Sequence, residues 1–154
     1  MSSRNLVIES LKFKNPERIP RQLWVLPWTE IKYPDELKEI KNSYPDDIVY
    51  SPSFFKKSLP IKGDKYKMGK YTDEWGCTRH NLQDGIAGEV KEPLVSDWSR
   101  VHKVHIPEGR LSIDMEKINE FCADTDKFVL PEVFQRPFER LQFLRKTENL
   151  FIDL

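Results

Sequence analysis

The sequence predicts an α/β fold in which a parallel sheet is interrupted by a small antiparallel sheet. Over residues 19–52 an apolar run, an amphipathic segment and a second apolar run follow one another at the length of one βαβ unit. Between the glycines at 63 and 76, aromatic and polar residues alternate instead, which indicates antiparallel strands. We expect one domain over residues 1–154, and we expect it to be incomplete.

The first third of the chain predicts two helices and two core strands. Ser2 or Ser3 caps a helix that ends before Pro16, because the residue preceding a proline disfavours the α region. The run Ile19–Pro27 is almost continuously apolar and bounded by prolines, which is typical of a strand buried on both faces of a parallel sheet. Pro34 opens a second helix, and the next predicted strand covers residues 47–52.

The rest of the chain predicts a small sheet, three helices and one more core strand. Residues 63–76 pair with 86–91 as an antiparallel hairpin or small sheet, and a short helix lies around 98–102. Ser112 or Asp114 caps a helix with one apolar face, which precedes a strand at 127–130. Pro137 opens another helix, and residues 147–154 have helical spacing without a stop signal, which we interpret as a cut near a helix end.

Composition argues against several classes of partner. The chain has 25 basic and 25 acidic residues, so we expect no binding to nucleic acid or to an anionic membrane surface. Its longest apolar stretch, residues 23–26, is far shorter than the roughly 20 residues of a membrane span. There is no signal-peptide pattern at the N-terminus. With only two cysteines, far apart in sequence, the chain is predicted to be cytoplasmic.

Four segments carry a resemblance to a known family. They are residues 4–20, the Tyr-Thr-Asp-Glu-Trp-Gly-Cys run at 71–77, residues 88–98 and residues 136–150. Together they resemble the N-terminal part of the uroporphyrinogen decarboxylase superfamily. The resemblance implies a (β/α)8 TIM barrel, which takes about 250 residues or more. The chain would then be the N-terminal half of such a barrel, carrying the antiparallel hairpin as an insertion.

The resemblance also implies an activity for the parent enzyme. It is either methyl transfer that depends on a corrinoid and zinc, or decarboxylation of a porphyrinogen. The arginine-rich segment that binds propionates in true decarboxylases is replaced here by Leu26-Pro-Trp28-Thr-Glu30-Ile, which favours methyl transfer. We expect the isolated chain to hold no cofactor and to be inactive. The alternative is a non-enzymatic binding or assembly module that pairs with itself or with a separately encoded C-terminal half.

Candidate site residues come from the loops expected at one end of the barrel. Asp73 is the candidate catalytic residue, as proton donor or charge stabiliser, and the alternative is a turn or surface residue. Since neighbours on a strand face opposite sides, at most one of Asp73 and Glu74 should point into a cavity. The candidate contacts for a small-molecule substrate should gather around that cavity, and they are Trp28, Glu30, His80, Gln135 and Arg136.

Histidine and cysteine spacing gives a weak metal signal. Cys77 and His80 have the spacing of half a zinc site, and His102 and His105 add two imidazoles. The strand-like stretch at 101–106 would place those two histidines on opposite faces. We therefore expect no metal in this chain, although zinc remains a possible cofactor of a full-length parent. Arg136 either pairs with a substrate carboxylate or lies at a helix N-terminus beside Pro137.

Overall fold

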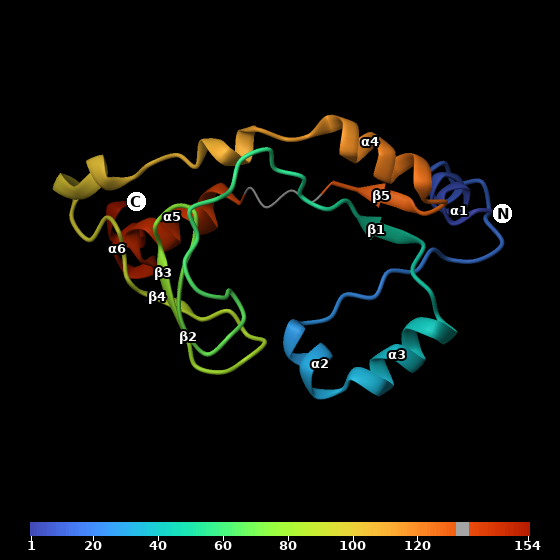
Figure 1. The fold of residues 1–154 in the computed structure, drawn as a ribbon, viewed down its shortest axis with the longest axis horizontal. Coiled ribbons are helices and arrows are strands. Elements are labelled where there is room, and N and C mark those ends of the chain that lie inside the picture. The colour runs from blue at the N-terminus through green and yellow to red at the C-terminus, as the bar shows by residue number, and fades with distance from the viewer. Residues whose placement is uncertain (132–135) are drawn as a thin grey trace. The chain divides into compact units, whose positions relative to one another are not determined.

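A computed structural model describes residues 1–131 and 136–154 and divides them into two compact units. The first unit contains residues 1–25, 29–56 and 113–131, and the second contains 26–28, 57–112 and 136–154. Both α-helices and β-strands are present, which confirms the mixed α/β class (Figure 1). The strands among these residues form two small sheets and no closed barrel.

The first unit is built around a parallel pair of short strands. β1 pairs with β5 in parallel, with Ile48 opposite Phe128 (Figure 1). Both strands lie within the runs predicted as strands, 47–52 and 127–130, but their pairing with each other was not predicted. Helix α1 packs against both strands. The elements of this unit are α1 (Ser3–Leu11), α3 (Pro34–Ser43), β1 (Ile48–Tyr50), α4 (Met115–Asp124) and β5 (Phe128–Leu130), and α2 (Pro27–Lys32) crosses the boundary between the units.

Local signals explain where the helices of this unit begin. The Ser2 hydroxyl accepts the Asn5 N–H and caps α1, while Leu6 and Val7 are buried on its inner face. Asp114 caps α4 through the Lys117 N–H, as one of the two predicted caps. The Arg4 side chain donates to the carbonyls of Cys122 and Thr125, both at 2.6 Å. Arg4 therefore satisfies carbonyl groups at the end of α4 that the helix itself leaves without partners.

The predicted first core strand is absent, so that expectation was wrong for this structure. Residues 19–26 form neither helix nor strand, and Trp24 is 76% exposed. Among the described residues, their backbone is bonded near the start, where Arg21 C=O accepts the Asp47 N–H at 2.8 Å and Leu23 N–H donates to Asp46 Oδ1 at 2.6 Å. Pro27 then opens α2, because proline fits the first position of a helix. The sequence analysis did not predict this helix.

Asp47 connects three segments of the first unit. Its carboxylate is 1% exposed and accepts two hydrogen bonds from Arg18, at 2.6 and 2.7 Å. The Ser3 hydroxyl donates to it at 2.7 Å, and the Arg21 N–H donates at 2.8 Å. Its own N–H and C=O bind Arg21 and Phe128. One buried side chain thus fixes α1, the coil before α2 and the start of β1.

We expect the first unit to lose stability in acid through Asp47. The hydrogen bonds from Arg18 hold the pKa of this carboxyl well below its usual range. The stabilisation is therefore complete above the ordinary carboxyl pKa of about 3.9 and is lost as the pH falls towards the folded-state value. Urea denaturation followed by circular dichroism should show a falling midpoint below about pH 4. An Asp47→Asn variant that falls as steeply would contradict this assignment.

The second unit contains a three-stranded antiparallel sheet in the order β2-β3-β4 (Figure 1). This confirms the predicted small antiparallel sheet, but the predicted pairing of residues 63–76 with 86–91 was wrong. The strands β2 and β4 both pair with β3, which the sequence analysis did not predict. Arg79 stands between Tyr71 and Val90 in the register. The elements of this unit are β2 (Gly69–Thr72), β3 (Thr78–Asn81), β4 (Glu89–Glu92), the 3-10 helices η1 (Trp98–Lys103) and η2 (Glu108–Leu111), α5 (Pro137–Arg145) and α6 (Thr147–Asp153).

The core of the second unit lies between this sheet and α5. Cys77, Val90 and Leu144 are buried together. Around them pack the partly buried side chains of Trp75, Leu94, Val104 and Phe143. Asn81, 3% exposed, donates from its amide nitrogen to the carbonyls of Lys65 and Lys67 at 3.0 and 2.8 Å, and so holds the loop before β2. None of the helices in the described ranges has both the length and the apolar character that a membrane span requires.

Candidate functional site

Asp73 lies in the turn between β2 and β3 and is 4% exposed. Its Oδ1 accepts the N–H groups of Trp75 and Cys77 at 3.1 and 2.9 Å, an arrangement that closes the turn locally. Its Oδ2 accepts a hydrogen bond from Arg140 Nη1 at 2.6 Å. Gly76 has a φ of +84°, a conformation that glycine adopts without steric cost. The carboxylate therefore joins the turn to α5.

Glu74, the next residue, is also buried, at 8% exposed, and accepts from Arg110 Nε at 2.6 Å. Burial is the largest influence on Glu74 and raises its pKa, but the hydrogen bond and charge of Arg110, a backbone hydrogen bond and the charge of Arg140 together lower it further, so the net direction is downward. Both acids are buried, and the expectation that at most one of them points into a cavity stays a prediction. They lie in a turn, where the alternation of a strand does not apply.

Arginines and aromatic rings surround this pair of acids. The Arg140 guanidinium lies 5.2 Å from the centre of the Trp75 ring and 5.4 Å from that of Phe143. Arg79 stacks on the same Phe143 ring at 3.9 Å and donates to the Gly88 carbonyl. These are cation–π distances, and they are stabilising when the cation is partly removed from water. We name Asp73, Glu74, Arg110 and Arg140 the acid–arginine cluster.

The acid–arginine cluster is suited to holding structure and not to proton transfer in the state described. Both oxygens of Asp73 are engaged by donors of the protein itself. A substrate would have to displace Arg140 or a turn N–H to reach them. The catalytic role of Asp73 stays a prediction, and the geometry identifies a positioning role. Sequence analysis missed Arg110 and Arg140; Arg140 belongs to the resembling segment at 136–150, while nothing marked Arg110.

Trp28 and His80 are associated with the other end of the small sheet. The Trp28 N–H donates to the Gly85 carbonyl at 3.1 Å, in the turn between β3 and β4. Gly85 approaches the Trp28 backbone so closely that no side chain could fit there, and its φ is +82°. His80 lies opposite Lys70 and Glu89 in the sheet register. His80 lies three residues beyond Cys77, the last residue of the Asp73 turn, which corresponds to roughly 10 Å along the strand.

The remaining candidate residues are distributed as follows. Arg136 precedes α5, is 71% exposed and pairs with Glu139 at 3.5 Å. It lies one helical turn before Arg140, so the structure brings it to the same helix end as the acid–arginine cluster. Glu30 belongs to the first unit and pairs with Lys41 at 3.4 Å. Gln135 lies outside the described residues. The substrate contacts proposed for all of these residues stay predictions.

Cys77 is fully buried beside Asp73. Burial raises the pKa of its thiol to about 11, and the nearby Asp73 acts in the same direction. The thiol is therefore protonated at neutral pH, and the thiolate is the nucleophilic form. Cys122 is partly exposed, in α4.

We predict that a thiol reagent distinguishes the two cysteines. At about pH 8, Ellman's reagent should modify Cys122 in the native chain and leave Cys77 unmodified, because Cys77 is protonated and out of reach. In denaturant both should react. Peptide mapping of the labelled protein identifies the residue. Rapid labelling of Cys77 in the native chain would show that the core of the second unit is open.

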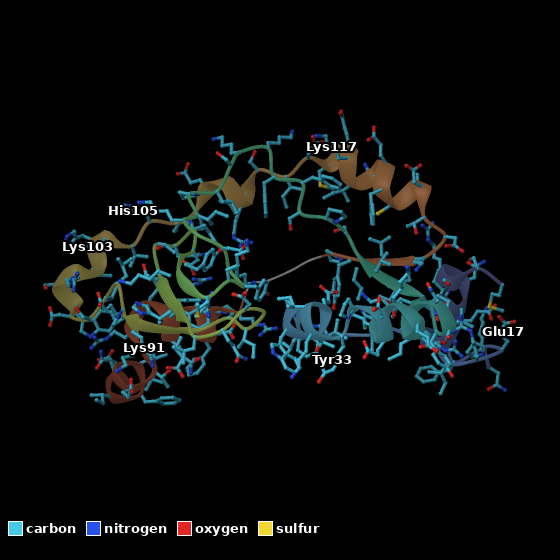
Figure 2. All side chains as sticks on the ribbon, turned by 60° about the horizontal axis from the view of Figure 1, so that its bottom comes forward. Glu17, Tyr33, Lys91, Lys103, His105 and Lys117 are labelled. Carbon is cyan, nitrogen blue, oxygen red and sulfur yellow. The ribbon has the colours of Figure 1, made fainter. Side chains whose placement is uncertain are left out.

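The candidate metal residues are not brought together. Among the described residues, no group of three or more histidine, cysteine, aspartate or glutamate side chains could hold a metal ion. His102 lies in η1, not in the expected strand, and its Nδ1 is 2.8 Å from the Ser99 carbonyl oxygen. His105 follows η1 in an exposed stretch (Figure 2). The described residues therefore do not bring a zinc site together, and the expectation that this chain holds no metal stays a prediction.

Comparison of the chain with family models, with curated proteins and with solved structures finds no match to any of them. The proposals that follow therefore rest on the sequence pattern and on the contacts described above.

Proposed function

We propose that the chain is the N-terminal part of a uroporphyrinogen decarboxylase-like barrel enzyme, with no activity of its own. The observation that supports this most is the parallel pairing of β1 with β5 across the long connection 51–127. Sheets made only of parallel strands occur almost only in α/β folds whose sheets are covered on both faces. Two strands of three residues each cannot make such a sheet alone, so further βα units are needed to complete it.

The parent reaction in this proposal is methyl transfer involving a corrinoid, or else decarboxylation of a porphyrinogen. The segment after residue 26 offers Trp28 and Glu30 where the resemblance implies arginines for propionate groups, which favours methyl transfer. Because the residues described here do not fit zinc, we assign no metal-dependent step to this chain. Its own contribution would be to position the barrel mouth, with Asp73 and Arg140 fixing the turn beside α5.

The test begins with the coding DNA after the Leu154 codon and in the neighbouring genes. We expect a reading frame that encodes further βα units and a His-x-Cys sequence. The chain should then be assayed alone and combined with that product. The assays follow demethylation of methylcobalamin by a low-molecular-weight thiol with added zinc, and coproporphyrinogen formation from uroporphyrinogen. Activity only in the combination supports the proposal, and equal activity of the 154-residue chain alone overturns the claim of inactivity.

The second candidate function is a binding or assembly module without catalysis. It is favoured by the large apolar side chains that the described residues leave exposed, such as Phe13 at 96% and Leu82 at 86%. Single exposed apolar residues are normal on a surface, but patches mark interaction sites. Analytical ultracentrifugation, which measures complex formation, distinguishes the two functions when it is used together with the activity assays. A stable complex with the C-terminal product that is inactive in both assays would favour assembly over catalysis.

A further inference from the structure

Lysines are concentrated in the ten residues that lead into β2. Four of the residues 61–70 are lysines, and Asp64 is the single acid among them. All four lysines, Lys62, Lys65, Lys67 and Lys70, are exposed. We name residues 61–70 the lysine loop. The chain as a whole has no net charge, so its composition hides a local excess of positive charge in this loop.

The backbone of the lysine loop is fixed against the small sheet. Asn81 in β3 binds the carbonyls of Lys65 and Lys67, as described above. The N–H and C=O of Lys62 pair with those of Thr72 in β2, at 3.0 and 2.8 Å. The exposed side chains therefore extend from a backbone that is already held in place. Binding a ligand there does not require the loop to become ordered, a cost that would weaken association.

The loop's own acid and an acid of the β3–β4 turn bind backbone amides. Asp64 Oδ1 accepts the Tyr66 N–H at 2.9 Å, and Asp84 Oδ1 accepts the Met68 N–H at 2.6 Å. The four lysines outnumber these two carboxylates. The last two lysines of the loop form no ion pair with any described residue. Their ammonium groups are available to an anionic partner.

Two large apolar side chains are exposed at the same end of the sheet. Gly69 is opposite Asn81 at the end of the β2-β3 pairing, so the next residues outward, Met68 and Leu82, lie at that end. They are 71% and 86% exposed. Lys67 lies at this end too, because Asn81 binds its carbonyl. Apolar side chains that protrude among lysines are typical of surfaces that insert shallowly into a membrane interface.

We propose that this end of the second unit docks on an anionic phospholipid surface. The lysine loop faces the headgroups, and Met68 and Leu82 reach into the boundary between headgroups and acyl chains. The sequence analysis argued against such a surface from total charge. Attraction to a membrane depends instead on charges within about a Debye length of it, roughly 10 Å at 0.1 M salt. The proposal concerns where the chain is held, so it goes beyond the proposed function and does not depend on the parent reaction.

A bilayer fits this surface better than a nucleic acid does. A single strand would neutralise the lysines but leave Met68 and Leu82 in water, and its bases bind best to several open aromatic rings. The lysine loop contains one aromatic residue, Tyr66, whose ring centre lies 5.0 Å from Lys65 Nζ. Tyrosine is enriched at membrane interfaces, where the ring is buried and the hydroxyl stays hydrated. Lysine ammonium groups act as point charges and need no fixed geometry of the headgroup.

Vesicle sedimentation tests the charge requirement with the 154-residue chain. We expect binding to phosphatidylcholine vesicles that contain about one third phosphatidylserine, weaker binding when the salt is raised, and none to phosphatidylcholine alone. Lys67→Glu with Lys70→Glu should lower the partition coefficient at least about tenfold. The matched control is Lys12→Glu with Lys38→Glu, two exposed lysines of the first unit, which changes the net charge equally.

The vesicle experiment has two outcomes that overturn the proposal. Equal losses in the two double variants would show that net charge and not the lysine loop determines binding. Failure of the unmodified chain to bind the anionic vesicles, with or without binding to single-stranded RNA or to polyglutamate at the same salt, would exclude a bilayer as the partner. Circular dichroism of each variant establishes that it is folded, and all four substituted lysines are exposed.

A dye attached at Leu82 tests the orientation independently of any charge variant. In a Cys122→Ser background, Leu82→Cys carries a polarity-sensitive fluorophore, and Glu92→Cys is the control. Glu92 is opposite Thr78, at the other end of β3. Adding anionic vesicles should shift the emission of the dye at 82 to shorter wavelength and leave that of the dye at 92 unchanged. Equal responses at the two positions, or none at 82 while the chain binds, overturn the proposed insertion. Neither measurement uses an enzymatic assay, so both are separate from the tests above.

Discussion

Replacing Asp47 by alanine is expected to destabilise the first unit strongly. The substitution removes both hydrogen bonds to Arg18 and those from Ser3 and Arg21. Breaking a buried ion pair by deleting one partner costs about 3–5 kcal/mol, since the remaining groups lose their compensation. The whole free energy of unfolding of a small domain is about 5–15 kcal/mol. Chemical denaturation followed by circular dichroism measures the loss.

Asp124→Ala is the matched control for this experiment. It removes the same side chain from the same unit, but Asp124 is exposed at the end of α4, and its side chain makes no hydrogen bond to a described residue. We expect a change within about 0.5 kcal/mol. If Asp47→Ala behaves like this control, the bonds to Arg18 and Ser3 do not hold the unit together.

The second large effect is expected at Asp73 in the other unit. Asp73→Ala should destabilise the second unit by about 3–5 kcal/mol, because Arg140 is left half-buried without its carboxylate and two turn N–H groups lose their acceptor. Asp73→Asn should be milder, since its amide oxygen still accepts from Trp75 and Cys77. Denaturation monitored by tryptophan fluorescence reports on this unit through Trp75.

The control for Asp73 is Glu92→Ala. Glu92 is exposed at the end of β4, and its side chain makes no hydrogen bond to a described residue. A further variant, Asp73→Ala with Arg140→Met, removes both charges and should recover part of the loss, because the buried guanidinium no longer lacks a partner. If Asp73→Ala and Asp73→Asn destabilise the unit equally, the effect belongs to the ion pair alone. That result would contradict the proposed role of the hydrogen bonds from the Trp75 and Cys77 N–H groups.

Helix starts and short strands were predictable because local chemistry determines them. Asp114 and Pro137 begin helices for reasons that can be seen in the sequence, and the glycine-bounded aromatic stretch did contain an antiparallel strand, β2. Its partner β3 lies outside that stretch and was not predicted. The strand at 19–27 was predicted on hydrophobicity alone. Strand formation also needs a hydrogen-bonded neighbour, and the sequence cannot show whether one lies within reach.

The candidate site was less predictable because it depends on long-range partners. Asp73 and Glu74 were recognised, but their partners Arg140 and Arg110 lie 67 and 36 residues further along the chain. No local spacing links such pairs. Because Arg140 is so far from Asp73 in the sequence, the ion pair that holds the proposed catalytic residue could not be predicted. A motif identifies the side chain, and only the fold determines what its oxygens bind.

The long connection between β1 and β5 determines the order in which the chain can fold during its synthesis. β5 leaves the ribosome only after residues 51–127 have been made, so β1 waits for its partner for about 4–15 s at common translation rates. The β2-β3-β4 sheet needs only residues 69–92 and can pair within that interval. Nascent chains therefore leave the β5-facing edge of β1 unpaired until residues 128–130 have been made.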